Sequence, residues 1–244
     1  MKSILGILFA ICLSACVLIG LSSCKEKTPA NVLFITGGHD YDKENFDKLL
    51  KKLPITYDHV EHPQAHAMLK ADKIASYDAI LLYDMPQEIS PEAQQDFIAM
   101  LEKGKGLVVL HHAFCSYDLW PEYINIIGGK YHHFPWMENG VEQAPSKFKQ
   151  DLTMQIKVED STHPITKGIT DFEILDEAYR GTQILSSVHP LLSTNEPLSG
   201  PLICWTNTYG KSKVVTFTLG HDAKAWENPS FIQVLSQAIE WSRK

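Results

Sequence analysis

Cysteine is scarce in this sequence of 244 residues, and three of its five cysteines lie within the first 24 positions. Only Cys115 and Cys204 remain in the rest of the chain, which excludes a small domain stapled by several disulfides. Basic residues are also in the minority, because 22 Lys and Arg stand against 29 Asp and Glu. A nucleic-acid-binding domain carries a basic stripe, so we expect no nucleic-acid partner.

Nucleotide-binding motifs are missing as well. Gly37-Gly38 lacks the further glycines of a dinucleotide-binding fingerprint, and no phosphate-binding loop with its lysine is present. We therefore expect no nucleotide cofactor. The sequence also has no internal repeat and no low-complexity tract. Residues 31–243 are numerous enough to form one domain with a sizeable core.

The N-terminus has the pattern of an export signal. Met1-Lys2-Ser3 gives a basic start, Ile4–Leu21 is almost wholly apolar, and Leu21-Ser22-Ser23-Cys24 closes the run. The ending is similar to a bacterial lipoprotein box, which predicts a signal peptide over 1–23, lipidation of Cys24 and a polar tether over 24–30. A transmembrane helix is the alternative. We expect a protein of the cell envelope, held by its lipid anchor at the periplasmic face or the outer surface.

The first half of the remaining chain alternates between strand and helix patterns. Short, continuously apolar runs predict strands covered on both faces, and Ser90-Pro91 is typical of a helix start. The expected strands are Asn31–Thr36, Ile55–Val60, Ala79–Tyr83 and Gly106–Leu110, and the expected helices are Lys43–Lys52, Ala67–Ala75 and Ser90–Leu101.

The pattern changes after Thr153. Met154–Val158 alternates between apolar and polar residues, and Cys204–Thr208 with Lys213–Thr218 predicts a hairpin, before the amphipathic helix Pro229–Ser242. The sequence therefore predicts an α/β fold with a mostly parallel central sheet, helices on both faces and a more mixed C-terminal half.

Three histidine-bearing motifs directly follow predicted strands. They are Gly37-Gly38-His39-Asp40, His111-His112-Ala113 and Gly220-His221-Asp222. The carboxyl ends of the strands of an open α/β sheet face one crevice, in which ligands bind. Imidazoles that reach this crevice can act as general bases, proton shuttles or metal ligands.

Eight ordered motifs make the chain resemble the ThuA-like (trehalose-utilisation) family from Asn31 to Trp241. They are Gly37-Gly38-His39-Asp40, His111-His112-Ala113-Phe114, Gly128-Gly129-Lys130-Tyr131-His132-His133, His163-Pro164-Ile165-Thr166-Lys167-Gly168, Asp176-Glu177-Ala178-Tyr179, Trp205 with Tyr209-Gly210, Leu219-Gly220-His221 and Ile239-Glu240-Trp241. The resemblance implies a flavodoxin-like fold similar to the class I glutamine amidotransferases. It also implies a role in carbohydrate metabolism, particularly of disaccharides and their keto derivatives.

The chain departs from the amidotransferase pattern at the nucleophile. That superfamily places a cysteine between glycines after a central strand, whereas here His111-His112-Ala113 follows Leu107–Leu110 and Cys115 comes later. Cys115 paired with His221 is one possible nucleophile and base. The alternative, which we favour, is that Cys115 is a small apolar residue.

We expect the reacting centre to contain His39, His112, Glu177 and His221. His111 and His112 are adjacent, so on an extended chain their side chains point to opposite sides, and we favour His112 as the one that faces the crevice. Aromatic rings stack on the apolar faces of sugar rings, while imidazoles and carboxylates bind the hydroxyls. The residues expected to bind substrate are Asp40, His111, Tyr131, His132, Trp136, Tyr179 and Trp226.

The residues leave several functions open. In the first, His39, His112 and His221 hold a zinc-like divalent metal with one open position. In the second, histidine and Glu177 move protons on a carbohydrate without a metal, either beside a keto group or at a glycosidic bond. A third is a non-catalytic sugar-binding accessory lipoprotein. The structural alternative is that these histidines only form hydrogen bonds at strand ends. A separate group of histidines lies around the second predicted strand, and we expect its members His59, His62 and His66 to be mostly solvated.

Overall fold

The computed structural model describes residues 28–244. The predicted signal peptide over 1–23 and the predicted lipidation site Cys24 lie outside these residues. Within the described part, no helix has the length and apolar character needed to cross a membrane.

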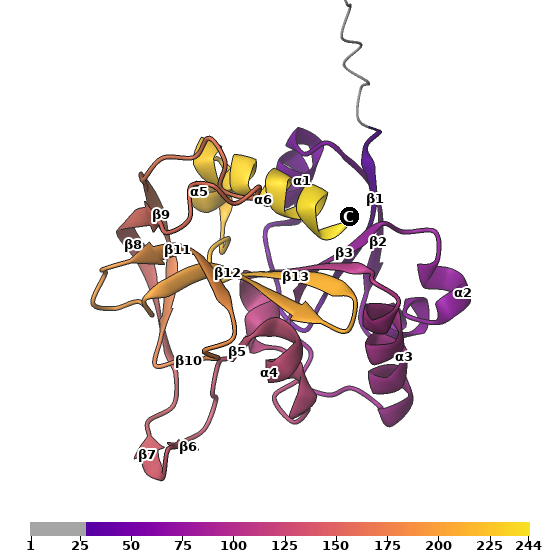
Figure 1. Ribbon diagram of the computed structural model, residues 1–244, viewed down its shortest axis with the longest axis horizontal. Helices are drawn as coiled ribbons and strands as arrows, with labels where there is room; N and C mark the ends of the chain where they lie inside the picture. Colours follow the sequence, from indigo (N-terminus) through magenta and orange to yellow (C-terminus); the bar gives the residue numbers. More distant parts are fainter. Residues whose placement is uncertain (1–27) are drawn as a thin grey trace, which may run out of the picture.

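A nine-stranded sheet forms the centre of the fold, with the strand order β2-β1-β3-β4-β13-β12-β11-β8-β9 (Figure 1). The pairs from β2 to β13 are parallel, and those from β13 to β9 are antiparallel. This confirms the predicted parallel half and the mixed half. The strands are β1 (Ala30–Gly37), β2 (Ile55–Glu61), β3 (Ala79–Asp84), β4 (Gly106–Leu110), β8 (Lys147–Val158), β9 (Phe172–Arg180), β11 (His189–Thr194), β12 (Leu202–Tyr209) and β13 (Ser212–Phe217).

Helices cover both faces of this sheet, with α1, α5 and α6 on one side and α2, α3 and α4 on the other (Figure 1). The inner parallel strands supply both cores because successive side chains point to opposite faces. Val32 and Phe34 of β1 pack in one core, and Leu33 and Ile35 pack in the other. The helices are α1 (Lys43–Lys52), α2 (Ala71–Ile74), α3 (Pro91–Glu102), α4 (Glu122–Ile127), α5 (Ala223–Trp226) and α6 (Pro229–Ser242), with 3₁₀ turns η1 (Gln64–Met68) and η2 (His111–Cys115).

The helix predicted over Ala67–Ala75 is wrong. The structure has η1 and α2 there, and Lys70 between them is extended, with a ψ of 142°. The buried side chains explain the break, because Leu69 and Ile74 are five residues apart. That spacing does not fit the three- or four-residue repeat of one helix face, so the backbone must change direction to bury both.

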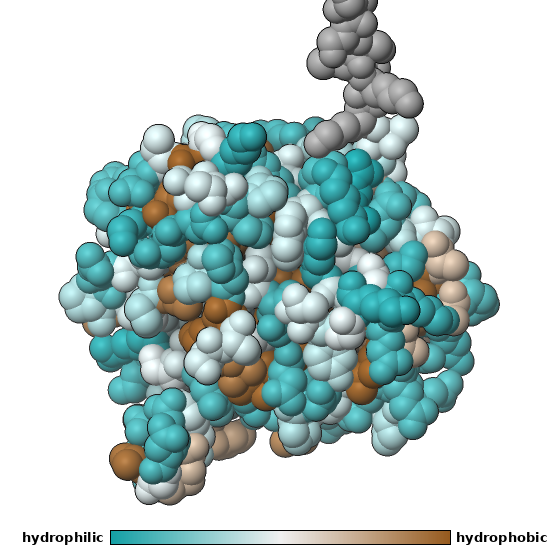
Figure 2. All heavy atoms as spheres, viewed as in Figure 1, coloured by the Kyte–Doolittle hydropathy of each residue, from teal (hydrophilic) through white to brown (hydrophobic). Residues whose placement is uncertain are grey.

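Two small sheets extend the mixed half of the fold. One pairs β5 (Gly129–Lys130) with β10 (Gln183–Ile184), and the other is the hairpin of β6 (Trp136–Glu138) and β7 (Val141–Gln143). This hairpin projects from the body at the lower left of Figure 1. Figure 2 shows a mostly hydrophilic face with apolar atoms at the end of the hairpin, where Met137 and Val141 are exposed.

Candidate functional site

Four histidines meet where β1, β4 and β13 end. His39 follows β1, His111 and His112 follow β4, and His221 follows β13. The ring centroids of His39 and His112 are 3.9 Å apart in a stacked pair. The centroid of His111 lies 4.5 Å from that of His112 and 5.3 Å from that of His221. The parallel half of the sheet therefore delivers all four imidazoles to one edge.

The backbone at His111 corrects the expectation that neighbouring histidines point to opposite sides. His111 has a φ of 49°, in the left-handed region, and begins the 3₁₀ turn η2. The chain is therefore no longer extended at this point, and both rings lie next to each other. His112 lines the cavity as expected, while His111 is completely buried behind it. A left-handed histidine is uncommon and costs on the order of 1–3 kcal/mol, which points to a functional constraint.

Two hydrogen bonds fix the ring of His111. Its Nδ1–H donates to the backbone oxygen of Thr218 over 2.7 Å, because a carbonyl can only accept. Its Nε2 lies 2.9 Å from the hydroxyl oxygen of Tyr179, whose ring stacks on the imidazole. With Nδ1 carrying the proton, the lone pair of the neutral ring is on Nε2, which faces Tyr179.

The carboxylate of Asp176 on β9 holds the turn that carries His221. It accepts hydrogen bonds from the backbone N–H groups of Gly220, His221 and Glu177, over 2.7, 3.0 and 2.8 Å. Burial raises the pKa of Asp176 even though these donors lower it. Gly220 has a φ of 112°, which side chains rarely tolerate, and a Cβ there would lie 3.1 Å from Leu110.

Glu177 lies between two of the imidazoles. One carboxylate oxygen is 3.4 Å from His111 Nε2, and the other is 3.7 Å from His221 Nε2. Burial by itself raises the pKa of Glu177, but its hydrogen bond to His111 and the charges of His111 and His221 outweigh burial and hold the pKa below its usual range. The carboxylate is therefore ionised at neutral pH and can accept a proton.

These groups surround a cavity of about 240 Å³ that opens at the strand ends. Of the residues expected at the reacting centre or in substrate binding, those in its lining are His39, His112, Tyr131, Glu177, Tyr179 and His221. The lining also contains Met85, Cys115, His133, Phe148 and Gln150. Met85 directly follows β3, so the strand-end argument could have found it, but no sequence signal singled out Phe148 or Gln150 on the long strand β8.

Five residues expected to bind substrate are not in this lining. His111 lies behind it, as described above. His132 stacks on Trp136 with ring centroids 4.1 Å apart and reaches Gln183 through its Nε2, so the two rings pack on each other outside the cavity. Asp40 lines a neighbouring cavity of about 340 Å³, which also includes His39.

Trp226 is not a pocket residue, which corrects the sequence prediction. Its side chain is 2% exposed and packs in the core against Phe46 and Tyr83. Its indole N–H donates to the backbone oxygen of Gly220 over 2.8 Å. Trp226 therefore supports the His221 turn from within the core.

Cys115 lines the cavity but has the properties of a buried thiol. It is 5% exposed, and burial raises its pKa, so the thiol stays protonated at neutral pH. Cys115 and Cys204 are both free and buried, so no disulfide joins them. This agrees with the preferred interpretation of Cys115 as a small apolar residue.

The expectation that His62 and His66 are mostly solvated is wrong. The side chain of His62 is 8% exposed, and its Nε2 lies 2.7 Å from the carboxylate of the completely buried Asp84. His66 is partly buried, its Nε2 is 3.2 Å from Tyr117 Oη, and burial lowers its pKa to about 4. His59 does remain exposed. No local pattern indicates this pairing, because Asp84 comes from a different strand.

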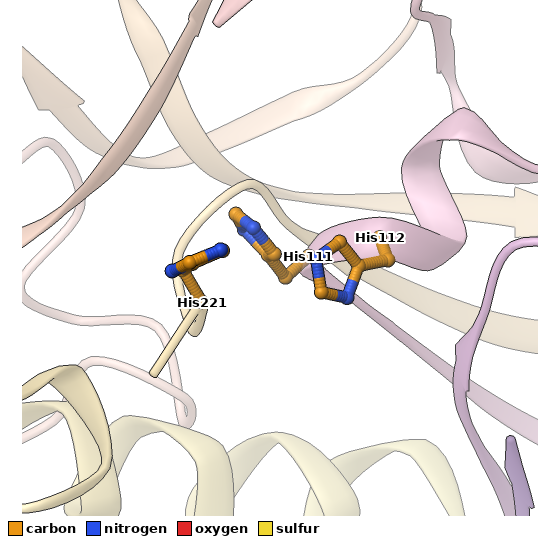
Figure 3. Close-up of side chains that lie close together, drawn as sticks. All are labelled: His111, His112 and His221. Carbon is orange, nitrogen blue, oxygen red and sulfur yellow. The ribbon is translucent and has the colours of Figure 1, made fainter. Parts of the chain in front are cut away.

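One group of side chains in the described part of the chain has the geometry of a metal-binding site. It consists of His111, His112 and His221, which each offer a nitrogen, and these nitrogens lie within 4.8 Å of one another (Figure 3). The set differs from the expected one, because His111 takes the place of His39. The Nδ1 of His39 lies 2.5 Å from the backbone oxygen of Asp40, and its ring covers that of His112.

Comparison with known proteins identifies the family. The family model described as ThuA, trehalose utilisation, matches residues 31–242. The chain belongs to the ThuA family. A search of curated proteins finds no match for this chain.

Solved structures share the fold of this ThuA family member. A ThuA-like protein from Parabacteroides merdae is 18% identical with a TM-score of 0.71, over 88% of this chain and 90% of that one. A ThuA-like protein from Bacteroides uniformis is 19% identical with a TM-score of 0.68, over 91% and 95%. A β-galactosidase from Rahnella sp. R3 matches 88% of this chain with 31% of its own, at 11% identity and a TM-score of 0.56. At these identities the likeness concerns the fold alone.

Proposed function

We propose that this ThuA family member is an enzyme that acts on a keto-sugar or an oxidised disaccharide, with Glu177 as the base that removes a proton beside the keto group. The observation that carries the proposal is the position of the Glu177 carboxylate, between His111 and His221 and in the lining of a cavity. A general base must be ionised and must face the substrate. Glu177 meets both conditions.

The composition of the cavity favours proton abstraction over direct hydrolysis of a glycosidic bond. Glycosidases generally use two carboxyl groups on opposite sides of the bond that breaks. Among the described residues that line the cavity, Glu177 is the single carboxylate. Its neighbour Asp176 is not in the lining, and its carboxylate accepts hydrogen bonds from three backbone N–H groups. One carboxylate is sufficient to remove a proton from carbon.

The proposed step needs a partner for the charge that develops. The C–H bond next to the carbonyl breaks and its proton passes to a Glu177 oxygen. Its electron pair forms a C=C bond to the carbonyl carbon, and the π electrons of the carbonyl move onto the oxygen. His39, His112 and His221 line the same cavity and supply the polar groups that stabilise this oxygen. Tyr131 and Tyr179 supply rings for the apolar face of the sugar.

The experiment is a screen of native disaccharides and their keto derivatives with the purified protein in deuterated water. We expect deuterium at the carbon beside the carbonyl, or product formed from it, with keto substrates and not with the native sugars. Products from native disaccharides alone would contradict proton abstraction. Binding of the sugars, followed by tryptophan fluorescence, without exchange or product under any metal would support the accessory role instead.

A further inference from the structure

The geometry points to a divalent metal site held by His111, His112 and His221, with the ion at the base of the cavity beside Glu177. The three imidazoles come from two segments that are far apart in the sequence, the turn after β4 and the turn after β13. Their ligand nitrogens lie within 4.8 Å of one another, and Figure 3 shows the three rings side by side, with His111 between the other two.

The orientation of His111 supports its role as a ligand. Its Nδ1–H is bound to the Thr218 backbone oxygen, so Nε2 carries the lone pair that an ion would use. In this structure that lone pair accepts the hydrogen bond of the Tyr179 hydroxyl, which a bound ion would replace. Histidines that bind metals generally donate their other ring N–H to a backbone carbonyl or a carboxylate in this way. The uncommon left-handed backbone of His111 places this ring beside that of its neighbour.

His112 is also in the form that binds metals. No hydrogen bond within residues 28–244 involves either of its ring nitrogens, although the residue is only 4% exposed. The ring lines the cavity, so a nitrogen that has no hydrogen-bond partner in the protein is open to an ion that enters there. Coordination of an ion would satisfy one of these nitrogens.

His221 completes the set from the opposite turn. Its backbone N–H is fixed by Asp176, and its Nε2 points toward the Glu177 carboxylate at 3.7 Å. Three imidazoles beside one carboxylate suit Zn²⁺ or a similar first-row ion better than Mg²⁺ or Ca²⁺, which prefer oxygen ligands. Zinc bound to three histidines typically keeps its fourth position for water or substrate. Here that position would face the cavity.

Zinc would bring the nitrogens closer together than they are in the structure. Tetrahedral coordination at about 2.0–2.1 Å corresponds to nitrogens roughly 3.3 Å apart. Closing from 4.8 Å to roughly 3.3 Å would bring two nitrogens closer by about 1.5 Å. His39 lies over His112 rather than around the common point, so its ring covers the site without belonging to the ligand set.

The ion's contribution to turnover rests on the proposed function, whereas its binding does not. Bound in this position, the ion would polarise the carbonyl oxygen of a keto-sugar while Glu177 removes the proton. The imidazoles would then act through the ion rather than as direct donors. Metal content and turnover are therefore measured separately.

The test uses the full chain without a histidine tag, loaded with Zn²⁺ and then dialysed. Elemental analysis should find about one equivalent of zinc, and Co²⁺ should give the visible absorption of a four-coordinate site. The His221→Ala and His112→Ala variants should weaken zinc binding by about a hundredfold or more, since even groups behind the ligands contribute 10–100-fold. His221 is the more accessible of the two, so His221→Ala keeps the test valid if His112→Ala fails to fold.

Two further variants decide the ligand set. His189→Ala removes an exposed histidine far along the chain and should leave zinc binding unchanged. His39→Ala should still bind one equivalent of zinc. If this variant loses the zinc, His39 is one of the ligands and the proposed ligand set is wrong. Less than about a tenth of an equivalent in the wild type, or full retention by His221→Ala, would overturn the metal site. Zinc binding without turnover of any keto-sugar would contradict the proposed function alone, and turnover with all metal removed would contradict the ion's role.

Discussion

The carboxylate of Asp176 accepts a hydrogen bond of 3.0 Å from the backbone N–H of His221. This contact joins β9 to the turn after β13, and the same carboxylate also holds Gly220 and Glu177. Asp176 therefore fixes two residues of the site, His221 and Glu177, relative to each other. It contacts them through their backbones and leaves their side chains free for the cavity.

We expect Asp176→Asn to destabilise the protein by about 1–3 kcal/mol. The amide group has one accepting oxygen, so at least one buried N–H group loses its partner. Urea unfolding measures the change, and Glu173→Gln on the exposed side of β9 is the control. An unchanged free energy of unfolding in Asp176→Asn would show that the carboxylate does not hold this turn.

Gly220→Ala should also lower stability, by on the order of 1–3 kcal/mol, because its φ of 112° is strained for any residue with a side chain. The new Cβ would meet Leu110 at 3.1 Å and Phe231 at 3.2 Å. Thermal unfolding checks the stability. Gly140→Ala provides a comparison at a glycine with φ of 81° but open space around it, which separates the effect of crowding from that of φ.

Cys115→Ser should retain turnover within about threefold, because burial raises the pKa of this thiol and keeps it in the poorly nucleophilic form. Alkylation followed by peptide mass analysis should label Cys115 slowly in the folded protein and quickly after unfolding. Loss of activity in the serine variant, with its fold intact, would restore Cys115 as a nucleophile.

Asp160 should make stability depend on pH at the acidic end. The pKa of Asp160 is lowered in the folded state by hydrogen bonds to its carboxylate. The hydroxyl of Thr162 contributes most, followed by the backbone N–H of Thr162 and the ring of His189. The unfolded chain therefore binds this proton more readily, and the stabilisation is present above the unfolded pKa of about 3.9 and lost as pH falls below it. The Tm of Asp160→Asn should lie below that of the wild type at pH 6, with the difference shrinking below pH 4. A difference independent of pH would contradict the role of the charge.

The N-terminal segment yields a separate prediction for the cell. We propose that Cys24 carries a lipid that holds the protein at the cell envelope, so a radioactive fatty acid should label the wild type and not Cys24→Ala. Label that survives in Cys24→Ala, or no label in either, would contradict the anchor.

The inner strands β1, β3 and β4 of the parallel half could be predicted from the sequence because they are covered on both faces. Gly106–Leu110 is continuously apolar and fully buried, and the serine cap at Ser90 marks the start of α3 as expected. The C-terminal hairpin was equally clear, since its apolar runs flank Tyr209–Ser212. These signals are local, and tertiary packing did not override them.

The failures concern features that depend on distant contacts. Histidine carries no signal for a left-handed backbone, so the rule for extended chains placed His111 and His112 on opposite sides. The residues next to His62 in the sequence do not indicate that it pairs with Asp84. Likewise, the position of Trp226 beside a predicted pocket motif does not indicate that its indole N–H donates to the backbone oxygen of Gly220 in the core. Glu177 was anticipated through the family motif rather than from the residues around it.

The most direct test of the account is the rate at which Glu177→Gln exchanges or converts a keto-disaccharide, measured against the wild type and Glu173→Gln. Glutamine keeps the size and shape of the side chain but cannot accept the proton. We expect the rate to fall by about 10²–10⁴-fold in Glu177→Gln and to be unchanged in Glu173→Gln. A folded Glu177→Gln protein that works at the wild-type rate would contradict it.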